Sequence, residues 1–526
     1  MSTAMWVRID LNSFENQNRG LVERSANGVT LLASSTLFGL TRIEDLAQAE
    51  YGIAIEIDSV NRRVRFGRDY LGHFPLLYAI SGPYLLISDE ISEIRSEIVR
   101  TGGRLTVSEE SLALYFTMGY VPQGMTLFNQ ITSCRNASLY EWSAGSVRET
   151  RLFRAVEVDL AVTVEDLVDA IDHDVAQLHR QHPSLDVWCS GGLDSSIVAH
   201  CAVRQSPTNV NILTMDYDPV IREQFAGGEV PFAQTIADHV GIPLTRVTMS
   251  HDRYAKAFQA IAEAHVGPVI DLAVLPKYVL AGASRQCVLT GEGGDPLFAG
   301  IKNTPFLFLR QNDPRRSLGY HYAAVHNRFF HQLRDIFVRG AELEEYVVEY
   351  FNRLFESYPG DVLRQLFYLN TFEKQGGEIF SESYYAGKRA GVSVRHPLAS
   401  RRVYDTAFAL PDSAKYRYPD GKLALIEAFG SRLPRAIVDR RKSGTIIPLE
   451  IYLDGLLLNK EFSLETVREI GGIRKEAIES CVHPARNGRT ALEVHAWLML
   501  DRWLTFNNGG ANERPANLPS ASGNYQ

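Results

Sequence analysis

The sequence is poor in the features that mark disulfide-bonded, membrane-spanning and nucleic-acid-binding proteins. Its 526 residues include five cysteines, and no two of them form a C-x-x-C pair. We therefore expect reduced thiols, no structural zinc and a cytoplasmic location. No run approaches the roughly 18 apolar residues that a membrane helix needs, and the N-terminus lacks the charged start and apolar core of a signal peptide. The formal net charge of −8 argues against a general nucleic-acid surface.

What is present is a glycine- and serine-rich loop inside a chain of globular composition. An apolar run at 185–188 leads into the loop S-G-G-L-D-S-S, and a helical pattern follows it. This order is typical of a strand, a tight loop and a helix. Glycines let the backbone approach an anion closely, and successive N–H groups at a helix start carry positive partial charge. We expect phosphate to be held by Ser190, Gly191, Gly192, Asp194, Ser195 and Ser196.

The loop differs from the G-x-x-x-x-G-K-[ST] phosphate loop, because no lysine follows its second glycine. An acidic residue within such a loop suits Mg²⁺, which travels with phosphate, and Asp194 is the candidate.

The segments around the loop predict a parallel sheet. Residues 163–181 have the spacing of an amphipathic helix, residues 210–217 read as a strand, and residues 229–241 read as a helix. Strands alternating with helices indicate a doubly wound sheet, which binds ligands at the carboxyl ends of its strands. Met215 lies near one such end and is a candidate for packing against adenine, although a plain core role fits it equally well.

A second loop, at 290–298, carries two acids. The apolar strand pattern at 286–289 runs into T-G-E-G-G-D-P-L-F. Gly291 and the other glycines around Glu292 let a substrate approach the backbone, and Asp295 is a second carboxylate for Mg²⁺, which usually takes one or two.

These motifs resemble those of the asparagine synthetase-like amide synthetases. The first loop is similar to the S-G-G-x-D-S-S pyrophosphate loop of ATP pyrophosphatases, and the second resembles the S-G-E-G-x-D-E-L-F-G-G segment of asparagine synthetases. The resemblance extends over most of the chain to about residue 505. It implies that a carboxylate attacks the α-phosphorus of ATP, giving an acyl-adenylate and pyrophosphate, and that an amine then displaces AMP. It also implies that Asp194 and Asp295 bind Mg²⁺.

A third segment, at 433–444, resembles the family pattern L-L-P-x-x-x-x-x-R-x-K-x-G. By this resemblance Lys442 contacts the phosphates and stabilises charge during acyl transfer, a role that suits a flexible cationic side chain. Glu292 is expected to orient the attacking amine or accept its proton. Related enzymes also place a carboxylate before a His-Pro segment. Glu378 and Glu382 are both candidates for that carboxylate, and each also fits an ordinary acid on a helix surface.

The first part of the chain resembles class II glutamine amidotransferase domains, in segments 64–78 and 84–91. The expected fold is therefore α/β. It has a glutaminase-like (Ntn-type) α+β sandwich over residues 1–155 and a doubly wound parallel sheet of the ATP pyrophosphatase type, with a helical cover, over 156–507. Residues 508–526 are expected to form a disordered tail. Those glutaminases use an N-terminal cysteine, whereas this chain has Ser2 and no cysteine before Cys134. We therefore expect a retained scaffold without glutaminase activity.

Without glutaminase activity, another amine must attack the adenylate. The form Arg395-His396-Pro397 is similar to that of lasso peptide cyclases, which join the N-terminal amine of a precursor peptide to an Asp or Glu side chain. We expect this activity, with ATP and Mg²⁺ as cofactors and a precursor peptide as substrate. A leader peptidase and a leader-binding protein are possible partners, and neither nucleic acid nor membrane is expected. The alternatives are ring closure of the β-lactam synthetase type, ammonia-dependent asparagine synthesis and a non-catalytic paralogue that acts as a scaffold.

Overall fold

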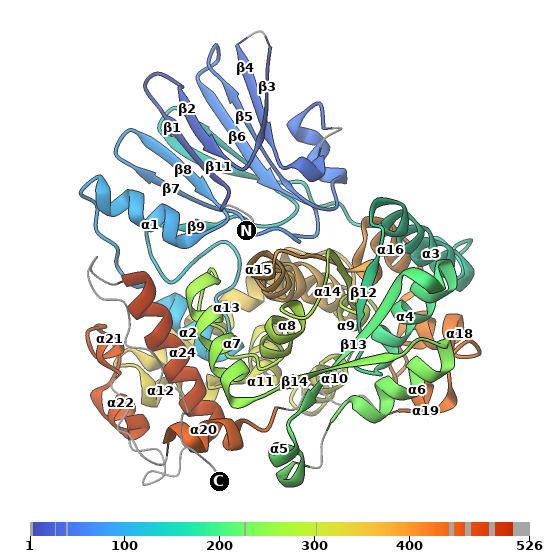
Figure 1. Ribbon diagram of the computed structural model, residues 1–526. Coiled ribbons are helices and arrows are strands. Elements are labelled where there is room, and N and C mark those ends of the chain that lie inside the picture. The colour runs from blue at the N-terminus through green and yellow to red at the C-terminus, as the bar shows by residue number, and fades with distance from the viewer. Residues whose placement is uncertain are drawn as a thin grey trace.

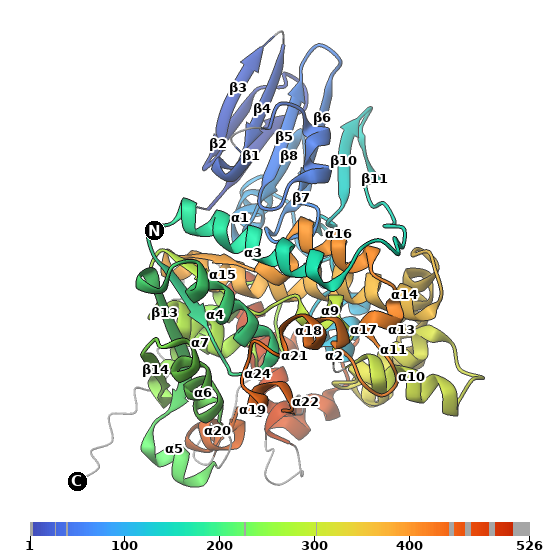
Figure 2. The same cartoon turned by 90° about the vertical axis from the view of Figure 1, so that its right-hand side faces the viewer.

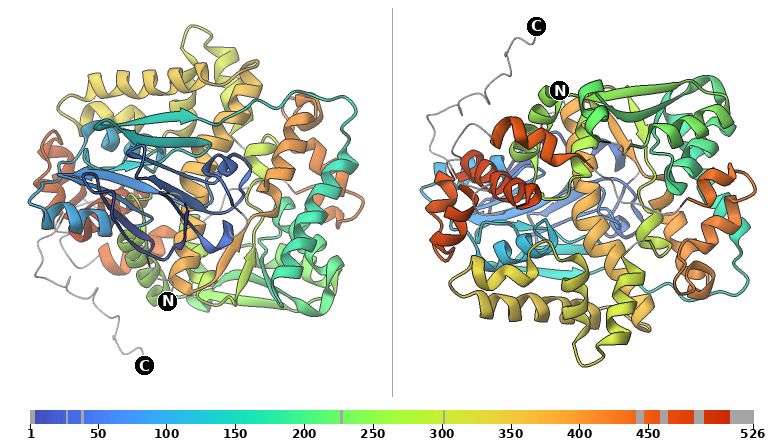
Figure 3. Two further views of the ribbon diagram at one scale, coloured as in Figure 1. Left: turned by 90° about the horizontal axis from the view of Figure 1, so that it is seen from above. Right: turned by 90° about the horizontal axis from the view of Figure 1, so that it is seen from below.

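The computed structural model describes residues 4–508, apart from 27, 38–39, 226–227, 301, 441–446, 458–463 and 483–489. Two antiparallel sheets lie at the top of Figure 1, and a parallel sheet surrounded by helices lies below them. Figure 2 shows α3 (Val164–Gln181) and α15 (Phe380–Ala390) running beneath the antiparallel sheets. In the view from above, the same sheets lie over the centre of the helical part (Figure 3).

The two antiparallel sheets pack face to face. The first sheet has the order β2-β1-β8-β7-β9 and the second has the order β11-β10-β6-β5-β4-β3. Apolar side chains of both sheets, among them Val7, Ile55 and Ile87, share one buried cluster. The strands are β1 (Trp6–Asp10), β2 (Asn16–Arg19), β3 (Val22–Ala26), β4 (Val29–Ala33), β5 (Ile53–Asp58), β6 (Arg63–Arg68), β7 (Leu77–Ser81), β8 (Tyr84–Ser88), β9 (Thr132–Ser133), β10 (Ser138–Ser143) and β11 (Ser146–Arg151).

The third sheet is parallel throughout and has the order β14-β13-β12-β15-β16. Its strands are β12 (Leu185–Trp188), β13 (Val210–Tyr217), β14 (Leu244–Met249), β15 (Cys287–Leu289) and β16 (Ser393–Arg395). Counted along the chain, this is the order 3-2-1-4-5, and it reverses between β12 and β15. Ligands of doubly wound sheets bind at such a reversal, beside the carboxyl ends of the strands.

Helices cover both faces of the parallel sheet. On one face lie α4 (Leu193–Gln205) and α6 (Val230–Val240), and on the other lie α7 (His251–Ala264), α8 (Val274–Ala281) and α15. Successive residues of a strand point to opposite faces, so Val187 and Ile212 join one buried cluster while Trp188 and Leu213 join the other. The burial of both faces explains why the central strands β12 and β15 are mostly apolar, whereas the edge strand β14 keeps exposed polar residues.

The remaining helices lie around this sheet, except that α1 packs against β7 and β8 of the antiparallel part. Their bounds are α1 (Ile91–Arg100), α2 (Glu109–Met118), α5 (Pro219–Gln224), α9 (Gly294–Leu297), α10 (Asn303–Asn312), α11 (Leu318–His326), α12 (Leu333–Ile336), α13 (Gly340–Glu356), α14 (Val362–Leu369), α16 (Arg401–Ala409), α17 (Asp412–Lys415), α18 (Leu423–Phe429), α19 (Arg435–Val438), α20 (Leu449–Leu457), α21 (Glu465–Arg468), α22 (Lys475–Val482) and α24 (Ala491–Asn508). Although α2 comes early in the chain, it packs against α13 and α11. Among the described helices, none is both long and apolar enough to span a bilayer.

The expected α/β class, with antiparallel sheets first and a parallel sheet with helices after them, is confirmed. The helix expected at 163–181 is α3, which Thr163 caps by accepting a hydrogen bond from the Asp166 N–H. The strand expected at 210–217 is β13, and α6 ends at Gly241 as its pattern predicts. Four cysteines, Cys134, Cys189, Cys201 and Cys287, are free and buried. The expected tail lies outside the described residues.

Candidate active site

The two glycine-rich loops meet at the reversal of strand order. The first follows β12 and the second follows β15, and these strands are neighbours in the sheet. At Gly291, a Cβ atom would lie 2.5 Å from the Ser195 nitrogen, and at Gly294 one would lie 2.3 Å from the Asp194 carboxyl group. Only glycine leaves room for this contact, so these two positions let the second loop pack directly on the first.

The first loop is ordered by its own serines. Ser190 donates its backbone N–H to Ser195 Oγ at 3.2 Å, the Gly192 N–H donates to Ser190 Oγ at 3.3 Å, and Ser195 Oγ donates to the Gly192 carbonyl at 3.2 Å. Helix α4 begins directly after Gly192, and Ser196 is buried within its first turn. The residues expected to hold phosphate are therefore gathered at a helix start, where N–H groups bind anions.

Asp194 and Asp295 converge on a single cation. The ammonium group of Lys422 lies 2.7 Å from Asp295 Oδ1 and is hydrogen-bonded to Asp194 as well. Asp194 and Lys422 are almost buried, whereas the Asp295 side chain is 39% exposed. Two carboxylates aimed at one positive charge, beside a phosphate loop, fit Mg²⁺, which takes one or two carboxylates and completes its octahedron with phosphate oxygens and water. Neither here nor elsewhere in the described residues is a group of three or more His, Cys, Asp or Glu placed to hold a metal, so a metal bound by this pair would need phosphate and water as its other ligands.

Glu292 belongs to a second charged cluster. Lys277 on α8 lies 3.2 Å from Glu292 and 2.7 Å from Glu382 on α15. Burial alone would lower the pKa of Lys277, but the two carboxylates outweigh it and raise that pKa, so the lysine is a cation. The Glu292 side chain is 31% exposed while those of Lys277 and Glu382 are nearly buried, so Glu292 is the member of the cluster that a substrate can reach.

Glu378 and Glu382 are both buried, so the interpretation of either as a helix-surface acid is wrong. Burial raises the pKa of Glu378 well above its usual value, and the nearby Glu382 and Asp271 raise it further. Burial also raises the pKa of Glu382, to about 7, against the opposing charge of Lys277. Glu382 joins the cluster of Glu292 through its ion pair with Lys277, whereas Glu378 lies just before α15, in the π-helix (Asn370–Ile379) that leads into it.

The remaining expected residues are placed as follows. Met215 is buried in the apolar cluster with Trp188 and Leu213, between β13 and helices α7 and α8. Lys442 lies outside the described residues. Arg440, which is described, donates to the Gly191 carbonyl at 3.1 Å and stacks 3.7 Å from the Phe232 ring centroid, so this part of the chain reaches the first loop.

The sequence alone does not identify Lys277 and Lys422 as site residues. Lys422 lies 228 positions from Asp194, and Lys277 lies 105 positions from Glu382. No local pattern marks pairs so distant in sequence. The one available signal was the dipeptide Gly421-Lys422, which stands near the Lys442 segment.

Glycine-rich loops and carboxylates that meet at the reversal of a doubly wound sheet are typical of enzymes that bind nucleotides. The comparisons agree: the profile of the Asparagine synthase family matches residues 166–506, and the chain belongs to that family. It is 22% identical over 489 residues to a "Putative asparagine synthetase [glutamine-hydrolyzing]" of Mycobacterium tuberculosis (strain ATCC 25618 / H37Rv), covering 84% of this chain and 73% of the relative. It is 23% identical over 437 residues to "Asparagine synthetase [glutamine-hydrolyzing] 1" of Bacillus subtilis (strain 168), covering 75% and 67%. The chain is thus an asparagine synthetase-like ligase, whose class of reaction is ATP-dependent amide formation.

Proposed function

We propose that this ligase forms a macrolactam in a lasso precursor peptide. An Asp or Glu side chain of the peptide is adenylated by ATP, and the N-terminal amine of the same peptide then displaces AMP. The observation that carries the proposal is the combination of two glycine-rich, carboxylate-bearing loops that meet at the sheet reversal with an N-terminal part that lacks the glutaminase cysteine. No cysteine occurs before Cys134, and Cys134 is fully buried.

Cys134 does not replace the missing nucleophile. Burial raises the pKa of its thiol far above the ordinary value, so the reactive thiolate is scarce. A hydroxyl such as that of Ser2 needs an activating base far more than a thiol does. Ammonia released from glutamine is therefore not the amine that this site uses, although two relatives are named for hydrolysing glutamine.

Separate groups of site residues suit the separate steps of this reaction. The first loop and Lys442 would hold the triphosphate, and Asp194 and Asp295 would hold Mg²⁺, which when bound offsets charge on the departing pyrophosphate. A peptide amine is protonated at neutral pH and must lose a proton before it attacks. Glu292 is partly exposed and lies beside the buried Lys277–Glu382 pair, so it is placed to orient the amine or accept its proton.

The test uses the purified protein with ATP, Mg²⁺ and a candidate precursor peptide encoded beside its gene. Mass spectrometry should detect a product lighter than the peptide by one water, formed together with pyrophosphate. A matched peptide with an acetylated N-terminus should give no such product. Ammonium-dependent amidation of a free carboxylate, with no reaction of the peptide amine, would instead indicate an ammonia-dependent synthetase. Absence of any pyrophosphate release would indicate a scaffold protein.

A further inference from the structure

The helix that carries Glu378 and Glu382 is unusually built. Between α14 and α15 the chain forms a π-helix, η5 (Asn370–Ile379), in which backbone hydrogen bonds join residues five apart. A turn this wide is rare and tends to occur at functional sites. It fixes the rotation of α15 relative to α14, and so it sets where Glu378 and Glu382 point.

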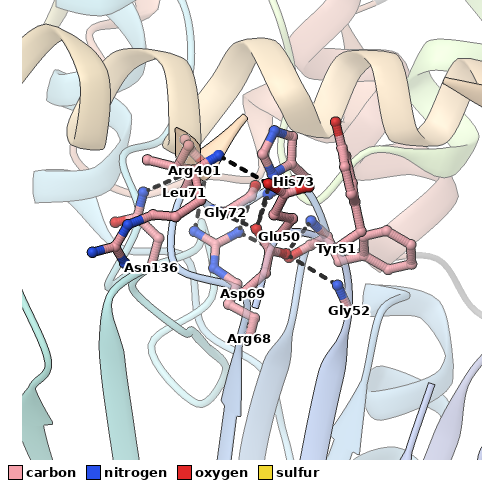
Figure 4. A network of polar contacts seen from close by, with 12 residues as sticks. Glu50, Tyr51, Gly52, Arg68, Asp69, Leu71, Gly72, His73, Asn136 and Arg401 are labelled. Carbon is pink, nitrogen blue, oxygen red and sulfur yellow. Dashed lines mark hydrogen bonds and ion pairs between the residues drawn. The ribbon is translucent and has the colours of Figure 1, made fainter. Parts of the chain in front are cut away.

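Side chains from β6 and from loops of the N-terminal part bind the backbone of this π-helix at Phe372 and Gly376. Gln123 Nε2 donates to the Phe372 carbonyl at 3.0 Å, and Asn136 Nδ2 donates to the same carbonyl at 3.1 Å. Arg68 at the end of β6 donates to the Gly376 carbonyl at 3.3 Å. Figure 4 shows Arg68 and Asn136 among the side chains gathered between the N-terminal strands and the helices above them. These donors are buried and carry their hydrogen bonds across the boundary between the two parts of the chain.

The close approach depends on one glycine. A Cβ atom at Gly376 would lie 2.1 Å from Asn136 Nδ2 and 2.4 Å from the Leu71 carbonyl oxygen, so a larger residue would push the N-terminal part away. The next residue, Gly377, has room, because a Cβ there would come no closer than 3.8 Å to Gln123.

The N-terminal part also holds α15 beyond the two glutamates. Tyr385 donates its hydroxyl to the Asp89 carbonyl at 2.6 Å, and Lys388 lies 2.5 Å from Asp89 Oδ2. Between the two attachment points, the His73 ring stacks on Phe380 with centroids 4.1 Å apart. The segment with Glu378 and Glu382 is therefore bracketed on both sides by residues that precede the synthetase sheet in sequence.

We infer that the N-terminal sheets, which lack a hydrolytic nucleophile, act as a clamp on η5 and α15 that positions Glu382, and through Lys277 also Glu292. Arg68, Gln123, Asn136 and Asp89 are positioning residues in this account. The amide-forming site is then incomplete without the N-terminal part. This role explains why the chain keeps a domain that has no catalytic residue of its own. Only the measurement of kcat with the precursor peptide rests on the proposed function; the hydrogen-exchange measurement does not.

The test compares two neighbouring glycines in the full-length protein. Gly376→Ala puts a methyl group into the contact, whereas Gly377→Ala, the matched control, puts the same group at ordinary van der Waals distance, 3.8 Å from Gln123. Alanine favours helix over glycine at both sites, so helix propensity alone predicts no loss in either variant. If the clamp is real, Gly376→Ala should speed amide hydrogen exchange in residues 370–390 about tenfold or more, because weaker contacts let this segment open more often. Gly377→Ala should leave exchange unchanged.

Catalysis supplies the second measurement. With the precursor peptide, Gly376→Ala should lower kcat by about tenfold with the KM for ATP within about twofold of wild type, since the phosphate loop is untouched and only catalytic geometry suffers. Equal exchange and equal kcat in the two glycine variants would overturn the inference. If the peptide is not a substrate, the exchange measurement still decides the clamp, and the failure then belongs to the proposed function alone.

Should Gly376→Ala fail to fold, Tyr385→Phe makes the same test from the other attachment point by removing one hydroxyl. Its control is Tyr452→Phe, which removes a hydroxyl bound at 2.8 Å to the Met249 carbonyl, away from the N-terminal part. Faster exchange near residue 385 in the first variant and not in the second supports the clamp. Unchanged exchange in both contradicts it.

Discussion

Lys277 is the buried cation on which the Glu292 cluster depends, and Lys277→Met tests that role. Methionine keeps most of the volume and removes the charge. At an effective dielectric constant of about 20, unit charges 2.7 Å apart attract by about 6 kcal/mol, using the Lys277–Glu382 distance. Part of this is offset by the cost of removing both groups from water, and breaking one buried pair typically costs about 3–5 kcal/mol. We therefore expect Lys277→Met to lower the free energy of unfolding by about 3–5 kcal/mol at pH 8.

The sign of the pH dependence follows from Glu382. Its pKa already lies above the ordinary value of 4.5 because it is buried, and loss of Lys277 removes the main opposing charge. In Lys277→Met the native state therefore keeps a proton on Glu382 that the unfolded state releases above pH 4.5. Stability of the variant relative to wild type should rise as the pH falls from 8 to about 7, by up to about 1.4 kcal/mol per unit, and then level off, because below about pH 7 Glu382 keeps its proton in both native proteins.

Urea unfolding at pH 8 and pH 6 measures this difference. Lys256→Met is the control, because Lys256 and Asp252 form an exposed pair, which is expected to contribute little. Glu382→Gln added to Lys277→Met should restore much of the lost stability, since no unpaired buried carboxylate then remains. A Lys277→Met protein as stable as wild type at pH 8, with no gain at lower pH, would refute the assignment of Lys277 as the cation of this cluster.

Five further substitutions probe the site. Asp194→Asn and Asp295→Asn should each abolish ATP-dependent pyrophosphate release with native circular dichroism; near-native release at low millimolar Mg²⁺ would remove that residue as a metal ligand. Glu292→Gln should retain isotope exchange between pyrophosphate and ATP while macrolactam formation falls, and loss of both would place Glu292 in substrate binding. Lys442→Ala should slow cyclisation by about 10²-fold, the usual effect of losing one electrostatic stabiliser; an unchanged rate would exclude that role. Glu378→Gln should change the unfolding free energy by less than about 1 kcal/mol, because burial already favours the neutral acid; a larger loss in urea unfolding would show that the carboxyl is ionised.

Much of the synthetase fold could be predicted because its signals are local. The Thr163 cap, the apolar run of β13 and the glycine that ends α6 each lie within a few residues of the element that they define. The two loops were also recognisable, since each is a short motif between a strand and a helix. Their contact then follows from sheet topology, which brings the ends of β12 and β15 together.

The missed features are long-range ones. Periodicity places Glu378 and Glu382 on a helix, but it does not show that the N-terminal sheets cover that helix and bury both acids. The π-helix has no local sequence marker, because its wide turn is held by Gln123 and Arg68, which lie far away in the chain. The sequence of β5, I-A-I-E-I-D, is a similar case: its alternation is typical of a half-buried strand, yet five of its six residues are buried.

The transfer of an oxygen atom tests the central claim most directly. If a substrate carboxylate attacks the α-phosphorus of ATP, one of its oxygens leaves with AMP when the amine closes the amide. A precursor peptide with ¹⁸O in its side-chain carboxyl groups should therefore give AMP that carries one ¹⁸O atom for each macrolactam formed. Label in inorganic phosphate, or product formed with unlabelled AMP, would contradict adenylation of the peptide by this enzyme.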